Sequence, residues 1–330
     1  MSKAIFIGVD VGGTSLRAAR FIGHNPTPDA KIKVATQPAG DAWQMLDRLE
    51  HVIREVAPPD LAGVEGIGVG IPGPVNPYTG VVINITNIPG WKNLPLRQIL
   101  EERLARPVFI GNDANLAALG EWKFGAGRGH ADVLYLTVST GIGGGVVTGN
   151  RLLLGAHGLA AEVGHILIRP NGPRCGCGQR GCLEALASGP AIARDAAERL
   201  SRGEGADSAL RALTNGDFSK LTTALIGHAA QQGDAFARSL FREAGEHLGY
   251  GLASLLHLYN PSIVILGGGV SFVGELFFEP VRATVRRYAM HEMYWRDVPI
   301  VPAALGDDAG LVGAGALAME ESRALVVPDR

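Results

Sequence analysis

One pattern limits the fold of this chain more than any other feature: an apolar strand, a glycine-rich turn and a second apolar strand occur twice. The two copies cover 4–9, 10–14 and 16–21, and then 133–138, 139–145 and a strand that starts at Val146. They lie about 130 residues apart, which is the sign of an internal repeat. Both copies place their glycines in hairpins between strands. We therefore expect two α/β lobes that arose by duplication.

Helices and further strands follow each hairpin, as expected for an α/β protein. Residues 42–57 predict a helix whose apolar face has side chains three or four positions apart. That face consists of Trp43, Leu46, Leu49, Ile53 and Val56. The other predicted elements are strands at 64–71, 107–111 and 262–266, helices through Leu116–Trp122 and near 190–202 and 235–258, and a last helix at 308–321. We place a small lobe at 1–117 and a large lobe at 118–307, with the last helix packing back on the small lobe.

Composition excludes several classes of protein. Of the 330 residues, 46% are hydrophobic, and the net charge is −2 without a run of like charges. Neither nucleic acid nor a membrane surface is therefore expected as a partner. No apolar stretch reaches the roughly 18 residues of a spanning helix, and the run after Lys3 is too short for a signal peptide. We expect a cytoplasmic protein.

The glycine turns point to phosphate, because glycine permits close approach and successive N–H groups bind anions. The chain contains no G-x-x-x-x-G-K-[ST] P-loop. Gly68, Gly70 and Gly73 fit G-x-G-x-x-G, but neighbouring prolines prevent the helix that a dinucleotide site requires. A plain turn explains either hairpin by itself. The four glycines between Gly141 and Gly145 favour a use beyond a turn.

The three cysteines of the chain lie close together and follow a histidine. His165, Cys175, Cys177 and Cys182 form the pattern H-x9-C-x-C-x4-C. Three thiolates and one imidazole make a closed tetrahedral zinc set, and an odd cysteine count excludes a disulfide framework. The alternative is three unrelated thiols beside an ordinary core histidine. Because four protein ligands leave no position for water, we expect the zinc to be structural.

Three carboxylates stand where they could meet a ligand. Asp113 follows a strand and precedes a helix, so it or Asn112 is a candidate helix N-cap. Asp113 also lies at the carboxyl end of a strand, where α/β proteins bind ligands, and could accept a proton from a hydroxyl group. Glu162 and Glu184 flank the predicted zinc ligands. Their alternatives are surface charge or support for the metal.

Together these motifs resemble the ROK family of bacterial sugar kinases and repressors, from about residue 4 to about residue 320. The matching segments are DVGGT at 10–14, GIPGP at 70–74, NIPGW at 87–91, GNDAN at 111–115, STGIGGG at 139–145, the block from Glu162 to Glu184, and LGGGV at 266–270. The block with CGCGQRGCLE is the most specific of them. Within the family, the chain looks most like the glucokinases.

The resemblance implies an α/β, two-lobed actin-like ATPase (hexokinase-type) fold, with duplicated mixed sheets and an active-site cleft between the lobes. It implies ATP-dependent phosphorylation of D-glucose at the 6-hydroxyl, with Asp113 as the general base. The implied sugar-binding residues are Asn112, Asp113, Glu162, His165, Glu184, Asn87 and Gly73.

The resemblance also assigns the nucleotide site and the cofactors, which are ATP, magnesium and a structural zinc. Asp10 would support magnesium, and the triplet Gly267, Gly268 and Gly269 would lie near the adenosine. The implied phosphate cradle consists of Gly12, Gly13, Thr14, Thr140, Gly141 and Gly143. Relatives are commonly dimers or tetramers, so we expect a homodimer or homotetramer.

Three other interpretations stay open. The same motifs occur in kinases for fructose, mannose or an N-acetylhexosamine. Some members of the family are sugar-sensing repressors, which we disfavour because the DVGGT loop begins at residue 10 and no basic patch is present. The third is a sugar-binding module that zinc stabilises and that has no catalytic activity. The intact Asp113 and the two hairpins argue against it.

Overall fold

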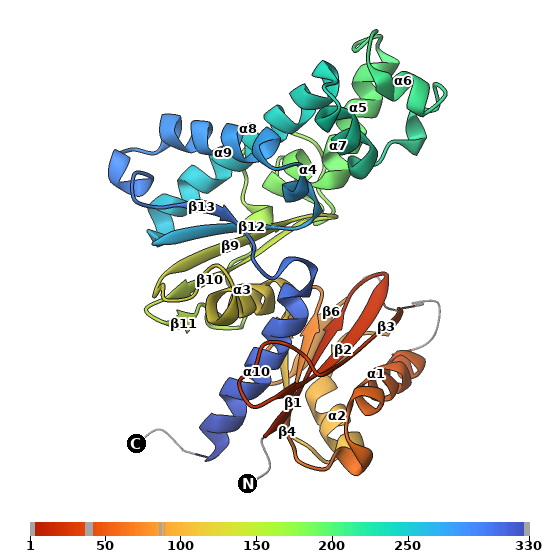
Figure 1. The fold of residues 1–330 in the computed structure, drawn as a ribbon, viewed down its shortest axis with the longest axis vertical. Coiled ribbons are helices and arrows are strands. Elements are labelled where there is room, and N and C mark those ends of the chain that lie inside the picture. The colour runs from red at the N-terminus through yellow and green to blue at the C-terminus, as the bar shows by residue number, and fades with distance from the viewer. Residues whose placement is uncertain (1–3, 37–41, 86–87, 89, 327–330) are drawn as a thin grey trace. The chain divides into compact units, whose positions relative to one another are not determined.

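The computed structural model describes residues 4–36, 42–85, 88 and 90–326, without the side chains of 324–326. The chain forms two compact units (Figure 1). Unit 1 comprises Met1–Gly129, Gly145–Ala161 and Ala304–Arg330, and unit 2 comprises His130–Gly144 and Glu162–Ala303. The expected boundary between 117 and 118 falls inside a helix of unit 1, α3 (Asp113–Phe124).

Unit 1 is built on a five-stranded sheet with the order β3-β2-β1-β4-β8. Its strands are β1 (Ile5–Val11), β2 (Ser15–Ile22), β3 (Ala30–Ala35), β4 (Val64–Ile71) and β8 (Val108–Asn112). A small sheet adds β5 (Val75–Asn76), β6 (Val81–Asn84) and β7 (Lys92–Leu94). The helices are α1 (Ala42–Val56), α2 (Leu96–Leu104), α3 and α10 (Ala309–Val326), with 3₁₀ turns at Pro59–Leu61 and Gly306–Asp308.

The second five-stranded sheet has the order β11-β10-β9-β12-β13. Its strands are β9 (Val133–Val138), β10 (Ile142–Thr148), β11 (Arg151–Leu152), β12 (Ile263–Gly267) and β13 (Ile300–Pro302). The helices of unit 2 are α4 (Leu183–Ala187), α5 (Gly189–Ser201), α6 (Ala209–Leu213), α7 (Thr223–Gln231), α8 (Ala235–Tyr259) and α9 (Glu275–Tyr288). Its 3₁₀ helices are η2 (Val163–His165), η3 (Phe218–Lys220), η4 (Gly269–Val273) and η5 (Glu292–Tyr294).

The two sheets share one topology. In each, the first strand lies in the middle, the next two strands extend the sheet to one side, and the last two lie on the other side. The last two strands run parallel to the first in both sheets. The parallel strands are β1, β4 and β8 in one sheet and β9, β12 and β13 in the other. The duplicated mixed sheet that the sequence predicts is therefore confirmed.

Helices cover both faces of the unit 1 sheet (Figure 1). Ile7 and Val9 of β1 point into the core formed with α1 and α2, while Phe6 points into a second cluster with Leu311 of α10. Such two-sided burial explains why β1 is an almost continuous apolar run. Gly8 faces α10 so closely that a Cβ would lie 2.6 Å from the carbonyl oxygen of Leu311.

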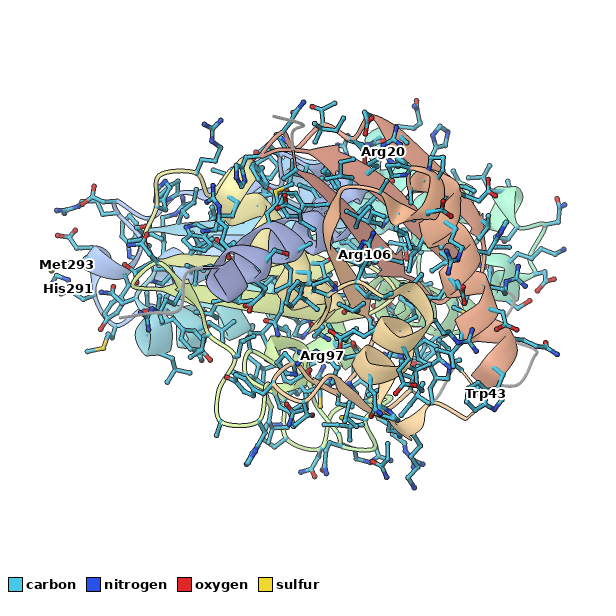
Figure 2. The ribbon with its side chains drawn as sticks, turned by 90° about the horizontal axis from the view of Figure 1, so that it is seen from below. Arg20, Trp43, Arg97, Arg106, His291 and Met293 are labelled. Carbon is cyan, nitrogen blue, oxygen red and sulfur yellow. The ribbon has the colours of Figure 1, made fainter. Side chains whose placement is uncertain are left out.

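Two expectations about element faces and bounds were wrong. Trp43 does not join the apolar face of α1, because its side chain is 59% exposed and lies at the outside of the helix near Arg103 (Figure 2). The strand expected to start at Val146 begins at Ile142. Its glycines serve strand packing: a Cβ on Gly144 would lie 2.6 Å from the carbonyl oxygen of Tyr135.

Across the described part of the chain, every helix is too short or too polar to cross a lipid bilayer. This agrees with the sequence, which lacks an uninterrupted apolar stretch of the necessary length.

Candidate functional site

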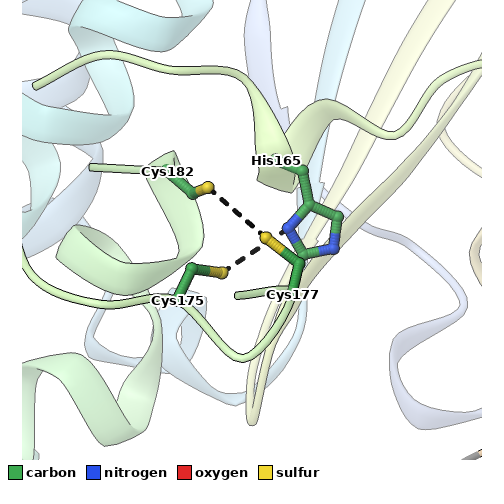
Figure 3. A group of neighbouring side chains, drawn as sticks. All are labelled: His165, Cys175, Cys177 and Cys182. Carbon is green, nitrogen blue, oxygen red and sulfur yellow. Dashed lines mark hydrogen bonds between the residues drawn. The ribbon is translucent and has the colours of Figure 1, made fainter. Parts of the chain in front are cut away.

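The four predicted metal ligands lie together in unit 2. Ligand atoms of His165, Cys175, Cys177 and Cys182 are all within 4.8 Å of one another (Figure 3). The sulfur of Cys177 is 3.7 Å from that of Cys182, and the sulfur of Cys175 is 3.6 Å from Nδ1 of His165. Tetrahedral zinc, with bonds of about 2.3 Å to sulfur and about 2.0 Å to nitrogen, needs separations of about 3.8 and 3.5 Å. The donor set therefore fits a zinc ion.

A tight loop brings the cysteines together. The N–H of Cys175 donates to the carbonyl oxygen of Gln179 at 2.8 Å, which closes the loop around Cys177. Gly181 has a φ of 81°, in the left-handed region that favours glycine. A Cβ there would also lie 1.7 Å from the carbonyl oxygen of Arg169. Gly181 is therefore required by the fold of this loop.

The environment of the thiols differs from one cysteine to the next. Burial raises the pKa of the Cys175 thiol to about 12, and burial also raises the pKa of Cys182. A hydrogen bond from the backbone N–H of Gln179 lowers the pKa of Cys177. A metal ion therefore displaces protons from Cys175 and Cys182 at neutral pH, and its affinity rises with pH.

Three predicted sugar ligands belong to the metal-ligand segment. Because Nδ1 of His165 faces the thiols, Nε2 lies on the opposite side of the ring (Figure 3). Glu162 is exposed and directly precedes η2, which carries His165. Glu184 lies in the first turn of α4, where its Oε2 accepts the N–H of Ile142 at 3.0 Å and its Oε1 is 3.4 Å from the sulfur of Cys175. The sequence did not predict the last two contacts.

In unit 1 the predicted residues follow the carboxyl ends of parallel strands. β1, β4 and β8 run parallel, so Asp10, Gly73 and Asp113 share one edge of the sheet. Ligands of α/β proteins bind at this edge. Asn87 lies outside the described residues.

Neighbouring residues at the start of α3 have different tasks. Oδ1 of Asn112 accepts the N–H groups of Ala114 and Asn115 at 3.0 and 3.1 Å, so Asn112 is the N-cap. Its amide nitrogen donates to the carbonyl oxygen of Gly73 at 3.3 Å, which ties the GIPGP segment to the helix. Asp113 is the first helical residue and is half-buried, where the helix N-terminus favours a negative charge.

Asp10 has a partner that sequence reasoning missed. The guanidinium of Arg17 donates to Oδ2 of Asp10 through Nε at 2.9 Å and through a second nitrogen at 2.5 Å. Asp10 is 7% exposed, so these two charge-assisted hydrogen bonds to one oxygen hold a buried carboxylate in place. The hairpin register, which sets Asp10 opposite Arg17, is the signal that would have found it.

The glycine-rich segments lie at strand ends in both units. Gly13 and Thr14 are exposed in the β1–β2 turn, where the N–H of Gly12 donates to the carbonyl oxygen of Ser15. Thr140 and Gly141 form the β9–β10 turn, whereas Gly143 lies within β10.

The glycine triplet stands at another strand end of unit 2. Gly267 ends β12, and Gly268, with a φ of 83°, leads into η4, which starts at Gly269. Since β9 and β12 are parallel, the β9–β10 turn and the triplet share one sheet edge.

Comparison with known proteins places the chain in a family. The model of the ROK family matches residues 6–321. The chain belongs to the ROK family. A relative, the glucokinase of Thermotoga maritima, is 38% identical over 97% of this chain and 99% of its own length.

Two further proteins are also similar to this chain. One is a ROK family glucokinase from Streptomyces griseus, whose crystal structure was solved in complex with glucose and AMPPNP. Its sequence is 40% identical to this chain, the match covers 96% of this chain and 100% of the glucokinase chain, and the TM-score is 0.82. A xylose repressor of Caldicellulosiruptor bescii is 32% identical over 96% of this chain and 78% of its own length. The expected two-lobed, actin-like sugar-kinase fold is confirmed.

Proposed function

We propose that this chain is a glucokinase, which transfers the γ-phosphate of ATP to the 6-hydroxyl of D-glucose. The observation that carries the proposal is the full-length likeness to ROK glucokinases, one of them solved with glucose and an ATP analogue. The product, glucose 6-phosphate, would feed glycolysis. We place the reaction in the cytoplasm, where thiols stay reduced, and expect a homodimer or homotetramer.

Asp113 is the general base of the proposed mechanism. Its carboxylate accepts the proton of the 6-hydroxyl while that oxygen attacks the γ-phosphorus and ADP leaves. Asn112, through its bond to Gly73, fixes the start of α3 and so the backbone of Asp113. Positioning of this kind supplies much of the catalysis in phosphoryl transfer.

The remaining sugar contacts come from the metal-ligand segment and the GIPGP and NIPGW segments. Each carboxylate of Glu162 and Glu184 can accept hydrogen bonds from sugar hydroxyls, and Nε2 of His165 can reach another hydroxyl. A structural zinc held by His165 and the three cysteines would fix the tautomer and orientation of that imidazole. The proposed sugar ligands are Asn87, Gly73, Asn112, Asp113, Glu162, His165 and Glu184.

The nucleotide site uses the two glycine turns and the triplet. The turns with Gly12, Gly13 and Thr14 and with Thr140, Gly141 and Gly143 would hold the phosphates, and Gly267–Gly269 would lie near the adenosine. Gly12 would serve by permitting close approach, since its N–H already donates to the carbonyl oxygen of Ser15. Magnesium supplies charge neutralisation on the phosphates when bound with ATP. Asp10 would face it through Oδ1, since Oδ2 is held by Arg17.

A sugar panel tests the proposal. Coupled assays with ATP and magnesium should give the highest kcat/KM for glucose among glucose, fructose, mannose and N-acetylhexosamines. A tenfold preference for another sugar would reject glucose as the substrate, but the protein would still be a sugar kinase. Tight sugar binding without turnover of any sugar would favour the sugar-binding module instead. A salt-dependent complex with DNA, again without turnover, would favour the repressor.

A further inference from the structure

The β9–β10 turn, Ser139–Gly141, is held from both sides by the segment that follows the metal ligands. On one side, Oε2 of Glu184 accepts the N–H of Ile142 at 3.0 Å. On the other side, the N–H of Gly189 donates to the carbonyl oxygen of Ser139 at 2.8 Å. Glu184 lies in α4 and Gly189 is the first residue of α5, so the turn is fastened at one point to each of two consecutive helices.

The contact between Glu184 and the turn is close-packed. A Cβ on Gly141 would lie 2.5 Å from Oε2 of Glu184, so glycine is needed for the carboxylate to approach the backbone. The N–H of Ser139 donates to the carbonyl oxygen of Gly141 at 2.8 Å, which closes the turn itself. These contacts give the turn a defined shape.

Helix α4 is anchored to the metal-ligand group. Cys182 is the N-cap of α4, two residues before Glu184, and its carbonyl oxygen accepts the N–H of Ala185 at 3.1 Å. The sulfur of Cys175 is 3.4 Å from Oε1 of Glu184. Cys182, one of the four metal ligands drawn in Figure 3, thus constrains the position of this carboxylate through the chain. The S–H of Cys175 donates to the carboxylate only while that thiol is protonated, before a metal ion binds.

We propose that Glu184 is a positioning residue that connects the metal-ligand group to the β9–β10 turn, so that bound metal increases the affinity for nucleotide phosphate. The proposal rests on the proposed function, in which Thr140 and Gly141 face phosphate. It adds to the sugar contact of Glu184 a separate role towards the second substrate. Its physical basis is preorganisation: a turn already fixed loses less conformational entropy when the nucleotide binds.

Calorimetric titration with magnesium and a non-hydrolysable ATP analogue, without sugar, tests this link. Glu184→Ala should weaken nucleotide binding at least fivefold, the lower end of usual coupling between two sites. Removal of metal from the wild-type protein with a chelator should weaken binding to a similar extent. In Glu184→Ala the chelator should add less than a twofold effect, because the connection is already cut.

Two matched variants separate the link from the sugar contacts. Glu184→Gln keeps the bridge, since its amide oxygen can accept from Ile142 while its NH₂ group can donate to the sulfur of Cys175. Its nucleotide affinity should stay within twofold of wild type even though glucose binds more weakly. Glu162→Ala removes the other proposed sugar carboxylate and should likewise leave nucleotide affinity within twofold.

Nucleotide affinity of Glu184→Ala within fivefold of wild type, or an equal chelator effect in both proteins, would overturn the proposal. If Glu184→Ala does not fold, hydrogen exchange on the wild-type protein decides. Chelation should speed exchange of the Ile142 amide and leave that of Val9 in β1 unchanged, and unchanged protection of Ile142 would overturn the link. A metal-loaded wild type that binds no nucleotide would overturn the proposed function as well, so the two failures are distinguishable.

Discussion

At the start of α3, the helix cap and the proposed general base are adjacent polar residues. Asn112 uses its amide to cap the helix and to hold Gly73. Asp113 places a carboxylate in the first helical turn, at the carboxyl end of β8. In the proposed mechanism the cap and the base are therefore different residues.

Replacement of Asp113 by Asn should lower kcat at least about 100-fold, the low end for loss of a general base. The fold should persist, because the amide oxygen of Asn can still accept the N–H of Ala114, as Oδ1 of Asp113 does at 2.8 Å. Steady-state kinetics with glucose and ATP measure the loss, and the thermal unfolding midpoint serves as the control. A near-normal rate would remove Asp113 from the mechanism.

Ala161, which directly precedes Glu162, is in an unfavourable backbone conformation. Its φ is 66° and its side chain is buried, although non-glycine residues avoid the left-handed region at a cost of about 1–2 kcal/mol. Ala161→Gly should raise the free energy of unfolding by about 0.5–1 kcal/mol, because the relief exceeds the entropic cost of glycine.

Urea denaturation measures this gain, and Ala160→Gly is the matched control. Ala160 is not among the non-glycine residues with positive φ, so glycine there should only destabilise, by about 0.5–1 kcal/mol. Equal effects of the two substitutions would contradict the assignment of strain to Ala161.

Some contacts of single residues can be predicted from the sequence, and others cannot. The metal ligands were predictable because spacing and ligand type alone specify the set. The bond from Glu184 to Ile142 was not, since it joins positions 42 apart in the chain. Glu121 is a similar case: its buried carboxylate accepts the N–H groups of Ala126, Ala304 and Leu305, which only the tertiary fold brings together.

Among the elements, each strand or helix that the sequence predicted is present with the predicted type, although some begin or end elsewhere. The sequence did not predict the other elements, which are β3, β5, β6, β7, β11, β13, α2, α4, α6, α7 and α9. The seven-residue glycine segment at 139–145 was expected to be a loop, yet β10 begins inside it at Ile142. Glycine has no strong preference of its own there, and close packing against neighbouring elements decides. Trp43 fits the helical spacing but lies beyond the part of α1 that the core covers.

Asp234 joins the starts of two helices in unit 2. Its Oδ1 accepts the N–H of Ala237 in α8, while its Oδ2 accepts from Oγ of Ser208 and from the N–H of Ala209 in α6. Burial acts to raise its pKa, but these hydrogen bonds outweigh burial and lower it below the ordinary value of 3.8. The ionised form therefore stabilises the fold above the ordinary pKa, and this contribution disappears as the pH falls through the lowered value.

Asp234→Ala should lower the free energy of unfolding at pH 7 by about 1–2 kcal/mol, as for other N-caps. Urea denaturation at pH 7, 5 and 3 should show a difference from wild type that persists at pH 5 and shrinks at pH 3. Asp234→Asn retains a neutral cap and should lose less. A difference that stays constant down to pH 3 would show that the charge of Asp234 is not involved.

For the whole molecule, the repeat in the sequence was enough to predict the duplicated sheet but not how the chain is divided. Unit 1 takes three separate segments and unit 2 takes two. The segment Gly145–Ala161 belongs to unit 1 although unit 2 flanks it on both sides along the chain. Such interleaving leaves no change in composition, so only contacts distant in sequence reveal it.

The last helix completes the first unit. α10 packs against β1, β4 and α3, and a Cβ on its Gly313 would lie 1.7 Å from the carbonyl oxygen of Leu116. Deletion of residues 304–330 should therefore expose the apolar face of the unit 1 sheet that carries Phe6 and Phe21. Hydrogen exchange should show lost protection in β1 and β4, with protection retained in β12 of unit 2. Protection of β1 equal to that in the full chain would contradict this dependence.

Interleaving also determines how the chain responds to mechanical tension. Four crossings join the units, after Gly129, Gly144, Ala161 and Ala303, and both ends of the chain belong to unit 1. A force that pulls the ends apart therefore enters the molecule through unit 1. Extension in an optical trap would then begin with rupture of unit 1, and unit 2 would bear the load only afterwards.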